Sequence, residues 1–180
     1  RADCRGVNKH RAMLTIRKAT RIDAEFIAVN VLNAMHMTPD EVQRLLPVCK
    51  DLVAMDNTLY SWRNAHIAQW NGDDAGVIVS YDGATYRQAA DLTFAIVRDR
   101  GGEDFTRMQS ETQAGEWYVD SIAVDAQFRR RGIASALIRH AVSLGRECAN
   151  IRYVTLCVDP AYPHLVKLYG RLGFTPDGET

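Results

Sequence analysis

Hydrophobic and polar positions follow two different periods along this chain, and the two periods predict its elements. Short runs rich in β-branched and aromatic residues predict strands at residues 14–18, 65–70, 75–81, 117–124 and 152–158. Apolar residues that recur every three or four positions predict helices over residues 20–35, 38–47, 84–100, 133–144 and 165–172. Strands and helices thus mix along one chain of 180 residues, a length typical of a single domain.

Local signals mark several element ends. Thr20, followed by Asp23 three residues later, predicts a helix start, and Thr38-Pro39-Asp40-Glu41 is a stronger start signal. Pro47 is expected to kink or end the second helix, because proline removes a helical hydrogen bond. Asn71-Gly72 lies between two strand-like runs, which is the strongest short signal for a β-hairpin.

Residues 117–144 predict a strand, a basic turn and a helix in direct succession. The first turn of a helix leaves backbone N–H groups without partners and carries partial positive charge, so it can bind a phosphate. Gly132 and Ala134 are small enough for a ligand to approach the backbone, and Arg129–Arg131 add permanent charge. The residues alone leave two interpretations open, namely an anion site and a solvated basic turn.

Composition narrows the possible functions. Lys and Arg number 22, as do Asp and Glu, so the zero net charge argues against a nucleic-acid-binding protein. The four cysteines have neither zinc-site spacing nor the density of a disulfide framework, which predicts no metal site and reduced thiols in the cytoplasm. No apolar run approaches the length of a membrane span. The dinucleotide-binding and Walker phosphate-binding spacings are also absent.

Two motifs resemble those of a known family. Arg129-x-x-Gly132-x-Ala134, preceded by the strand 121–124, resembles the acyl-CoA signature of the GNAT superfamily of N-acetyltransferases. The segment 168–174, Leu-Tyr-Gly-Arg-Leu-Gly-Phe, resembles the closing Leu-Tyr-x-x-x-Gly-Phe of the same family. The resemblance implies an α+β fold with a mixed, mostly antiparallel sheet, in which strands 117–124 and 152–158 run parallel and splay apart.

The resemblance also implies a domain organisation. Residues 13–180 are expected to form one acetyltransferase domain, and residues 1–12 a leader or extension outside it. Residues 84–113 are expected to be an insertion near the acceptor side, where relatives commonly have a short turn. A further strand is expected to begin at Phe174, but the family's last hairpin would be truncated, so a homodimer through that sheet edge is a further expectation.

Acetyl-CoA is the cofactor that the resemblance implies. The residues expected to bind it lie on the strand end, the basic turn and the first turn of the helix. They are Ile122, Ala123, Val124, Arg129, Arg130, Arg131, Gly132, Ile133, Ala134 and Ser135. Backbone N–H groups around Ile122 and Val124 are expected to act as oxyanion donors.

Three side chains are candidates for proton transfer. Tyr169 matches the family's tyrosine general acid, whereas packing is the ordinary role of a helical tyrosine. Strand alternation places Glu116, Tyr118 and Asp120 on one face, so Asp120 or Glu116 can serve as general base. A solvated carboxylate remains the alternative for both.

The expected function is therefore transfer of an acetyl group from acetyl-CoA to a primary amine, by direct attack in a ternary complex. The acceptor class is open between a small molecule and a protein amine, with no nucleic acid or membrane as partner. The alternative function is a catalytically silent acyl-CoA-binding sensor or an interaction protein of the same fold.

Overall fold

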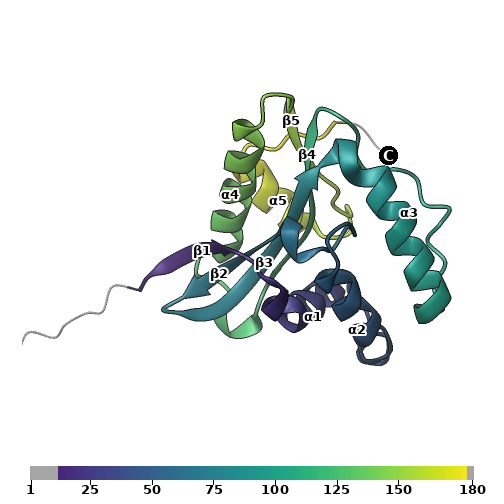
Figure 1. Ribbon diagram of the computed structural model, residues 1–180. Helices are drawn as coiled ribbons and strands as arrows, with labels where there is room; N and C mark the ends of the chain where they lie inside the picture. The colour runs from purple at the N-terminus through teal and green to yellow at the C-terminus, as the bar shows by residue number, and fades with distance from the viewer. Residues whose placement is uncertain (1–11, 178–180) are drawn as a thin grey trace, which may run out of the picture.

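The computed structural model describes residues 12–177, whose centre is a five-stranded mixed sheet (Figure 1). The strands lie side by side in chain order: β1 (Leu14–Lys18), β2 (Ala65–Trp70), β3 (Asp73–Asp82), β4 (Glu116–Val124) and β5 (Tyr153–Leu156). The first four are antiparallel to their neighbours, and β5 runs parallel to β4. This is the α+β arrangement that the resemblance implied.

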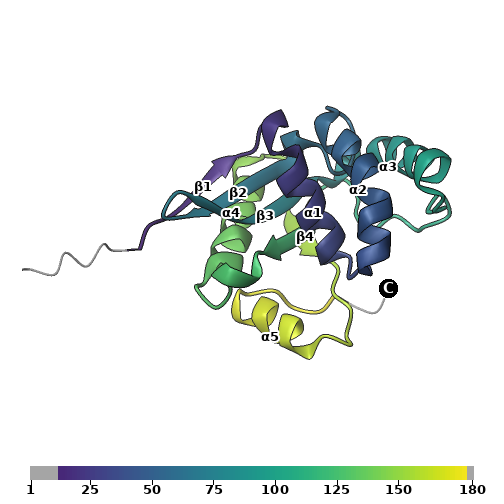
Figure 2. The same ribbon diagram turned by 90° about the horizontal axis from the view of Figure 1, so that it is seen from below.

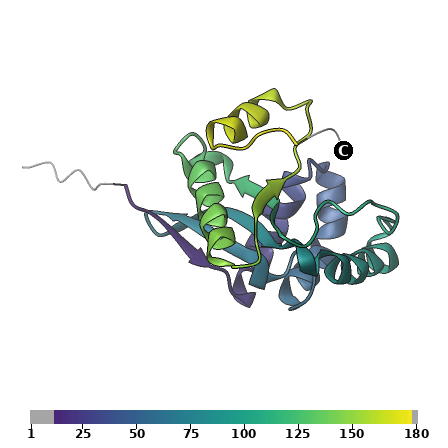
Figure 3. The same cartoon turned by 90° about the horizontal axis from the view of Figure 1, so that it is seen from above.

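Helices cover both faces of the sheet (Figures 1 and 2). Helices α1 (Ala24–Ala34) and α2 (Pro39–Ala54) pack on one face, and α3 (Tyr86–Ile96) lies beside α2. Helix α4 (Ile133–Glu147) packs on the other face, where its apolar side contacts β3 and β4. Helix α5 (Pro163–Arg171) lies next to the start of α4 (Figure 3). Among the helices of residues 12–177, none is long and apolar enough to cross a bilayer.

The β2–β3 hairpin turns on Asn71 and Gly72 alone. Both have positive φ angles, 54° and 95°, as a two-residue turn of this kind requires. Asp73 pairs with Trp70, so the loop is two residues shorter than the sequence suggested.

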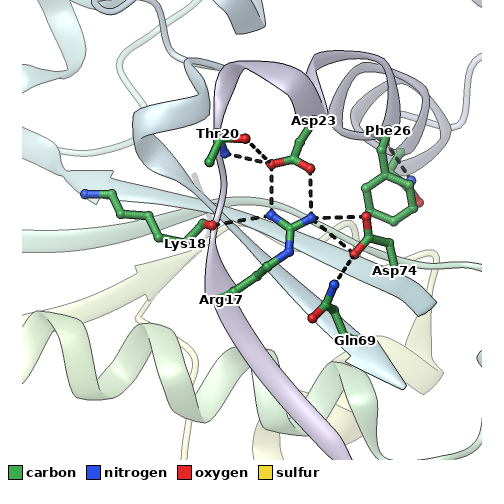
Figure 4. Close-up of polar contacts among 8 residues, drawn as sticks. Arg17, Lys18, Thr20, Asp23, Phe26, Gln69 and Asp74 are labelled. Atoms are coloured by element: carbon green, nitrogen blue, oxygen red, sulfur yellow. Dashed lines mark hydrogen bonds and ion pairs between the residues drawn. The ribbon is translucent and has the colours of Figure 1, made fainter. Parts of the chain in front are cut away.

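Arg17 on β1 forms ion pairs that connect this strand to the residues before α1 and to β3 (Figure 4). The guanidinium of Arg17 donates to both carboxylate oxygens of Asp23, at 2.9 and 2.8 Å, and also contacts Asp74 on β3. Asp23 accepts from the backbone and side chain of Thr20 as well, which confirms the predicted helix start. The hydrogen bond from Arg17 lowers the pKa of Asp23 to about 2.

Two elements do not end or begin where the sequence suggested. Helix α2 continues through Pro47 to Ala54, because the residues after Pro47, including Val48 and Leu52, are buried against α1 and the sheet. Residues 174–177 form no strand. Gly173 has a φ of 94° and turns the chain back, so that the N–H of Phe174 donates to the Tyr169 carbonyl at 3.1 Å.

Candidate active site

A β-bulge divides β4 at Asp120. Val79 lies opposite Ser121 and Ser80 lies opposite Val119, which leaves Asp120 as the extra residue on β4. Tyr118 faces the core under α1 and α2, and Asp120 lines one cavity together with Tyr118 and contacts Tyr81 of that core, so these two residues share a face as the alternation predicted. The bulge changes the phase after Asp120, and Ile122 packs toward α4.

Beyond the bulge, β4 and β5 separate. Their pairing joins Glu116–Val119 to Tyr153–Leu156, and no further pair follows within the described chain. The N–H of Asp125 donates to the Ala75 carbonyl. In an antiparallel sheet, this bond means that Val124 and Gly76, which lie opposite each other, form a pair without mutual hydrogen bonds. The N–H groups of Ile122 and Val124 therefore point away from β3, toward the side where β5 has diverged.

A cavity of about 1370 Å³ lies along this separation. One part is lined by the end of β4, the residues after β5 and the inner side of α5, including Ile122, Ala123, Val124, Cys157, Tyr162 and Tyr169. The other part is lined by the end of α1, by α2 and α3, and by the segment before β4, including Met35, His36, Met37, Phe94, Phe105 and Glu111. Asp120 lines the same cavity.

Asp120 is held by two hydroxyl groups. Tyr81 donates to Oδ2 at 2.6 Å, and Ser121 donates to Oδ1 at 2.8 Å. Burial raises the pKa of Asp120 to about 6, against the opposing effect of these hydrogen bonds. A carboxylate with such a pKa is ionised at neutral pH and can still accept a proton.

A second carboxylate, Glu111, belongs to the same cavity. It accepts a hydrogen bond of 3.1 Å from the hydroxyl of Tyr118, whose ring lies 5.9 Å from that of Tyr81. Sequence reasoning missed Glu111, because it lies in a segment without periodicity and no local motif marks it.

Glu116, the other candidate base, does not line the cavity. Its carboxylate accepts hydrogen bonds from Thr112, Gln113 and Thr155, at 2.9 to 3.3 Å. Burial would raise the pKa of Glu116, but these hydrogen bonds outweigh it and hold the pKa below its ordinary value. In this position Glu116 joins the segment before β4 to β5.

Tyr169 lines the cavity from α5 and is 8% exposed. Its ring packs edge-on against Phe174, with the centroids 6.1 Å apart. Burial raises the pKa of Tyr169, so the hydroxyl stays protonated through the neutral range.

A smaller cavity of about 280 Å³ lies at the N-terminus of α4. Gly132 precedes the helix with a φ of 77°, and the N–H of Ala136 is the first to bond back, to the Gly132 carbonyl. The preceding N–H groups have no partner inside the helix. The lining brings together seven of the predicted residues, Val124, Arg129, Arg130, Gly132, Ile133, Ala134 and Ser135. Backbone donors, a helix terminus and two arginines fit a diphosphate group.

The three arginines of this turn do not share one orientation. Arg129 donates to the Val124 carbonyl at 3.2 Å. Arg131 lies over the rings of Trp70 and Phe128, at 5.3 and 5.6 Å from the ring centroids, and lines neither cavity. The grouping of Arg131 with the anion-binding residues thus has no support in the geometry. Among residues 12–177, no cluster of His, Cys, Asp and Glu could hold a metal ion.

The sequence model of the Acetyltransferase (GNAT) family matches residues 55–174, two thirds of the chain. The chain belongs to the GNAT acetyltransferase family.

Solved structures of similar fold agree with this assignment. An N-acetyltransferase from Staphylococcus aureus Mu50 is 23% identical, covers 92% of this chain and 93% of its own, and superposes with a TM-score of 0.73. Another acetyltransferase is 25% identical, with 89% of both chains covered and a TM-score of 0.68. An aminoglycoside N-acetyltransferase in complex with CoA is 16% identical, covers 96% of this chain and 94% of its own, and has a TM-score of 0.62. Among curated proteins, none matches the chain.

Proposed function

We propose that this GNAT protein transfers an acetyl group from acetyl-CoA to a primary amine by direct attack in a ternary complex. The observation that carries the proposal is that Asp120, Tyr169 and the unpaired end of β4 line one cavity. Its neighbour is the smaller cavity at the N-terminus of α4, with which it shares Val124, Arg129, Ala134 and Leu168. A similar fold solved with CoA bound supports the choice of cofactor.

Acetyl-CoA would supply the acetyl thioester. The N–H groups of Ile133, Ala134 and Ser135, with the side chains of Arg129 and Arg130, would hold the diphosphate, because a helix N-terminus favours negative charge. The N–H groups of Ile122 and Val124 would stabilise negative charge on the reacting carbonyl oxygen.

Asp120 would remove the proton that the acceptor ammonium must lose before its nitrogen can attack. The nitrogen–carbon bond then forms while the carbon–sulfur bond breaks, and Tyr169 would give its proton to the departing sulfur. The nitrogen must lose a second proton to become the amide, and this proton would leave to solvent. The proton on Asp120 would then leave to solvent. Tyr169 can be reprotonated by the same route, so both groups return to their starting states.

Release of free thiol from acetyl-CoA, measured over a panel of primary amines, tests the proposal. Wild-type protein is expected to release thiol only when an amine is present. In Asp120→Asn, kcat is expected to fall about a hundredfold or more, because the amide cannot accept the proton.

The pH profile separates this role from a loss of folding. The logarithm of kcat/KM for the wild type should rise with pH up to about 6, where Asp120 becomes ionised, and this limb should be absent from Asp120→Asn. Asp91→Asn is the control, since Asp91 is exposed on α3 and lines neither cavity. Equal activity of Asp120→Asn and wild type at pH 7 would show that Asp120 is not the base.

A further inference from the structure

The acceptor part of the large cavity is mostly apolar. It is enclosed by the end of α1, by α2 and α3, and by residues 105–111, none of which belongs to the two sequence motifs. The side chains that form its walls are chiefly aromatic, thioether and aliphatic groups, beside the polar side chains of Asn33, His36 and Thr93. The apolar side chains include Met35, Met37, Phe94, Val97, Phe105 and Met108.

Negative charge in this part is confined to one place. Four acidic residues line the cavity as a whole within the described chain, but Asp125 and Asp159 each accept a backbone N–H of the turn that follows them. The remaining two, Glu111 and Asp120, are joined through neighbouring tyrosine side chains, and the rings of those tyrosines lie 5.9 Å apart. One end of the acceptor part therefore carries both of these carboxylates.

The apolar walls are held in position by contacts with α2. Arg44 on α2 donates to the carbonyl of Gly101 and pairs with Glu103 at 2.6 Å. The ring of Phe94 on α3 packs against Phe105, with the centroids 6.1 Å apart. The segment after α3 is thus attached to the helical layer, and its apolar side chains line a preformed space.

We propose that the acceptor is a primary amine with a single ammonium group on an apolar, aromatic-sized body, and that Glu111 binds this ammonium beside Asp120. The inference rests on the proposed function and adds the substrate class to it. A polycation such as an aminoglycoside or a polyamine would bring further ammonium groups against Phe and Met side chains. Burial of a charge without a partner is costly, so the walls select against such acceptors.

Competition among defined amines tests the substrate class. Thiol release from acetyl-CoA is measured with 2-phenylethylamine and n-hexylamine as apolar monoamines, and with spermidine and kanamycin as polycations. We expect kcat/KM for 2-phenylethylamine to exceed that for either polycation at least tenfold, which corresponds to one poorly paired ammonium.

Two substitutions test the residues. Glu111→Gln is expected to raise KM for 2-phenylethylamine about tenfold while kcat changes much less, because Glu111 binds the ammonium but does not take its proton. Glu147→Gln, at an exposed position at the end of α4 that lines neither cavity, is the control and should leave KM unchanged. Phe94→Ala should raise KM for 2-phenylethylamine and leave that for ethylamine unchanged.

The outcomes separate the inference from the proposed function. Transfer to spermidine or kanamycin in preference to the apolar monoamines would overturn the inference and leave the acetyltransferase function standing. If no amine releases thiol, the proposed function fails. The thermal unfolding midpoint with CoA and 2-phenylethylamine then decides the inference, since a silent site of this chemistry would still be stabilised by the amine. Absence of that stabilisation would overturn it.

Discussion

Tyr169 is a side chain with two possible roles that the fold itself does not separate. It is 8% exposed and packs against Phe174, as a purely structural tyrosine would, yet it also lines the large cavity. Within residues 12–177 its hydroxyl has no hydrogen-bond partner in the protein. Because Tyr169 lines the cavity, its hydroxyl can donate a hydrogen bond or a proton to a bound ligand.

Replacement of Tyr169 by phenylalanine distinguishes the two roles. Tyr169→Phe keeps the ring and its packing, so we expect the free energy of unfolding to change little. The proton donor is lost, and kcat is expected to fall about tenfold to a hundredfold with little change in KM for acetyl-CoA. Steady-state kinetics and a thermal melt on the same preparation measure both quantities.

Tyr153→Phe provides the control for this measurement. Tyr153 lies on β5 with 68% of its surface exposed and lines neither cavity. It should leave kcat unchanged. If Tyr169→Phe retained the wild-type kcat, the general acid would have to be sought elsewhere, and Tyr169 would be a packing residue.

At the scale of elements, anion binding at the start of α4 can be tested with Gly132→Ala, a substitution that adds a single methyl group. A Cβ added at Gly132 would meet no atom within 4 Å, yet Gly132 lines the small cavity. In Gly132→Ala the methyl group would occupy space that a diphosphate needs. We expect the Kd for CoA, measured by calorimetry, to rise about tenfold or more, which a loss of one or two backbone hydrogen bonds to a charged group would produce.

Gly72 in the β2–β3 turn offers a matched control. It also has a positive φ, 95°, and also has no atom within 4 Å of an added Cβ. Both Gly→Ala substitutions should therefore lower the free energy of unfolding by about 1 kcal/mol, because a side chain is strained in this backbone conformation. Only Gly132→Ala should weaken CoA binding. Equal affinities for the two variants would exclude close contact between the ligand and Gly132.

Most elements could be predicted from the sequence because their signals are local. The Asn71-Gly72 turn and the Thr38 cap each depend on a few adjacent residues, and both form as predicted. The end of α2 could not be predicted in the same way, because burial of Val48 and Leu52 against other elements outweighs the break expected at Pro47.

The candidate site shows the same division between local and long-range signals. Gly132 and its neighbours line a cavity at a helix start, where a motif of adjacent residues placed them. Glu111 could not be found, since its place in the cavity depends on a hydrogen bond from Tyr118 on another element. Glu116 and Arg131 were assigned to the site only from their positions in the sequence. A hydrogen bond from Thr155 directs the side chain of Glu116 away from the cavity, and the ring of Trp70 holds that of Arg131.

For the molecule as a whole, stability should depend on pH through a pair of histidines on the face of the sheet that α4 covers. His66 on β2 and His140 on α4 contact each other edge to face, with ring centroids 4.5 Å apart. Nδ1 of His66 and Nε2 of His140 are buried and have no partner among the described residues. Burial, aided by the neighbouring histidine, lowers the pKa of His66 to about 4, and burial also lowers that of His140.

The direction of the effect follows from proton uptake. In the unfolded chain a histidine has a pKa of about 6.5, so between pH 6.5 and 4 the unfolded state binds a proton that folded His66 does not. Unfolding is therefore favoured as the pH falls through this range. Asp120 acts in the opposite direction, because its raised pKa makes the folded state take up a proton near pH 6.

His66→Phe isolates the contribution of the histidine, because it keeps an aromatic ring beside His140 and removes the titrating group. Urea unfolding of wild type and variant is measured from pH 7 to pH 4. We expect the free energy of unfolding of the wild type to fall by about 2 kcal/mol more than that of His66→Phe over this range. This value is smaller than the full pKa shift of His66 would give, because His66 is only partly buried. His164→Phe, an exposed position on α5, should follow the wild-type curve. Parallel curves for wild type and His66→Phe would mean that the folded protein accommodates the charged imidazole, and the buried pair would then have no part in acid unfolding.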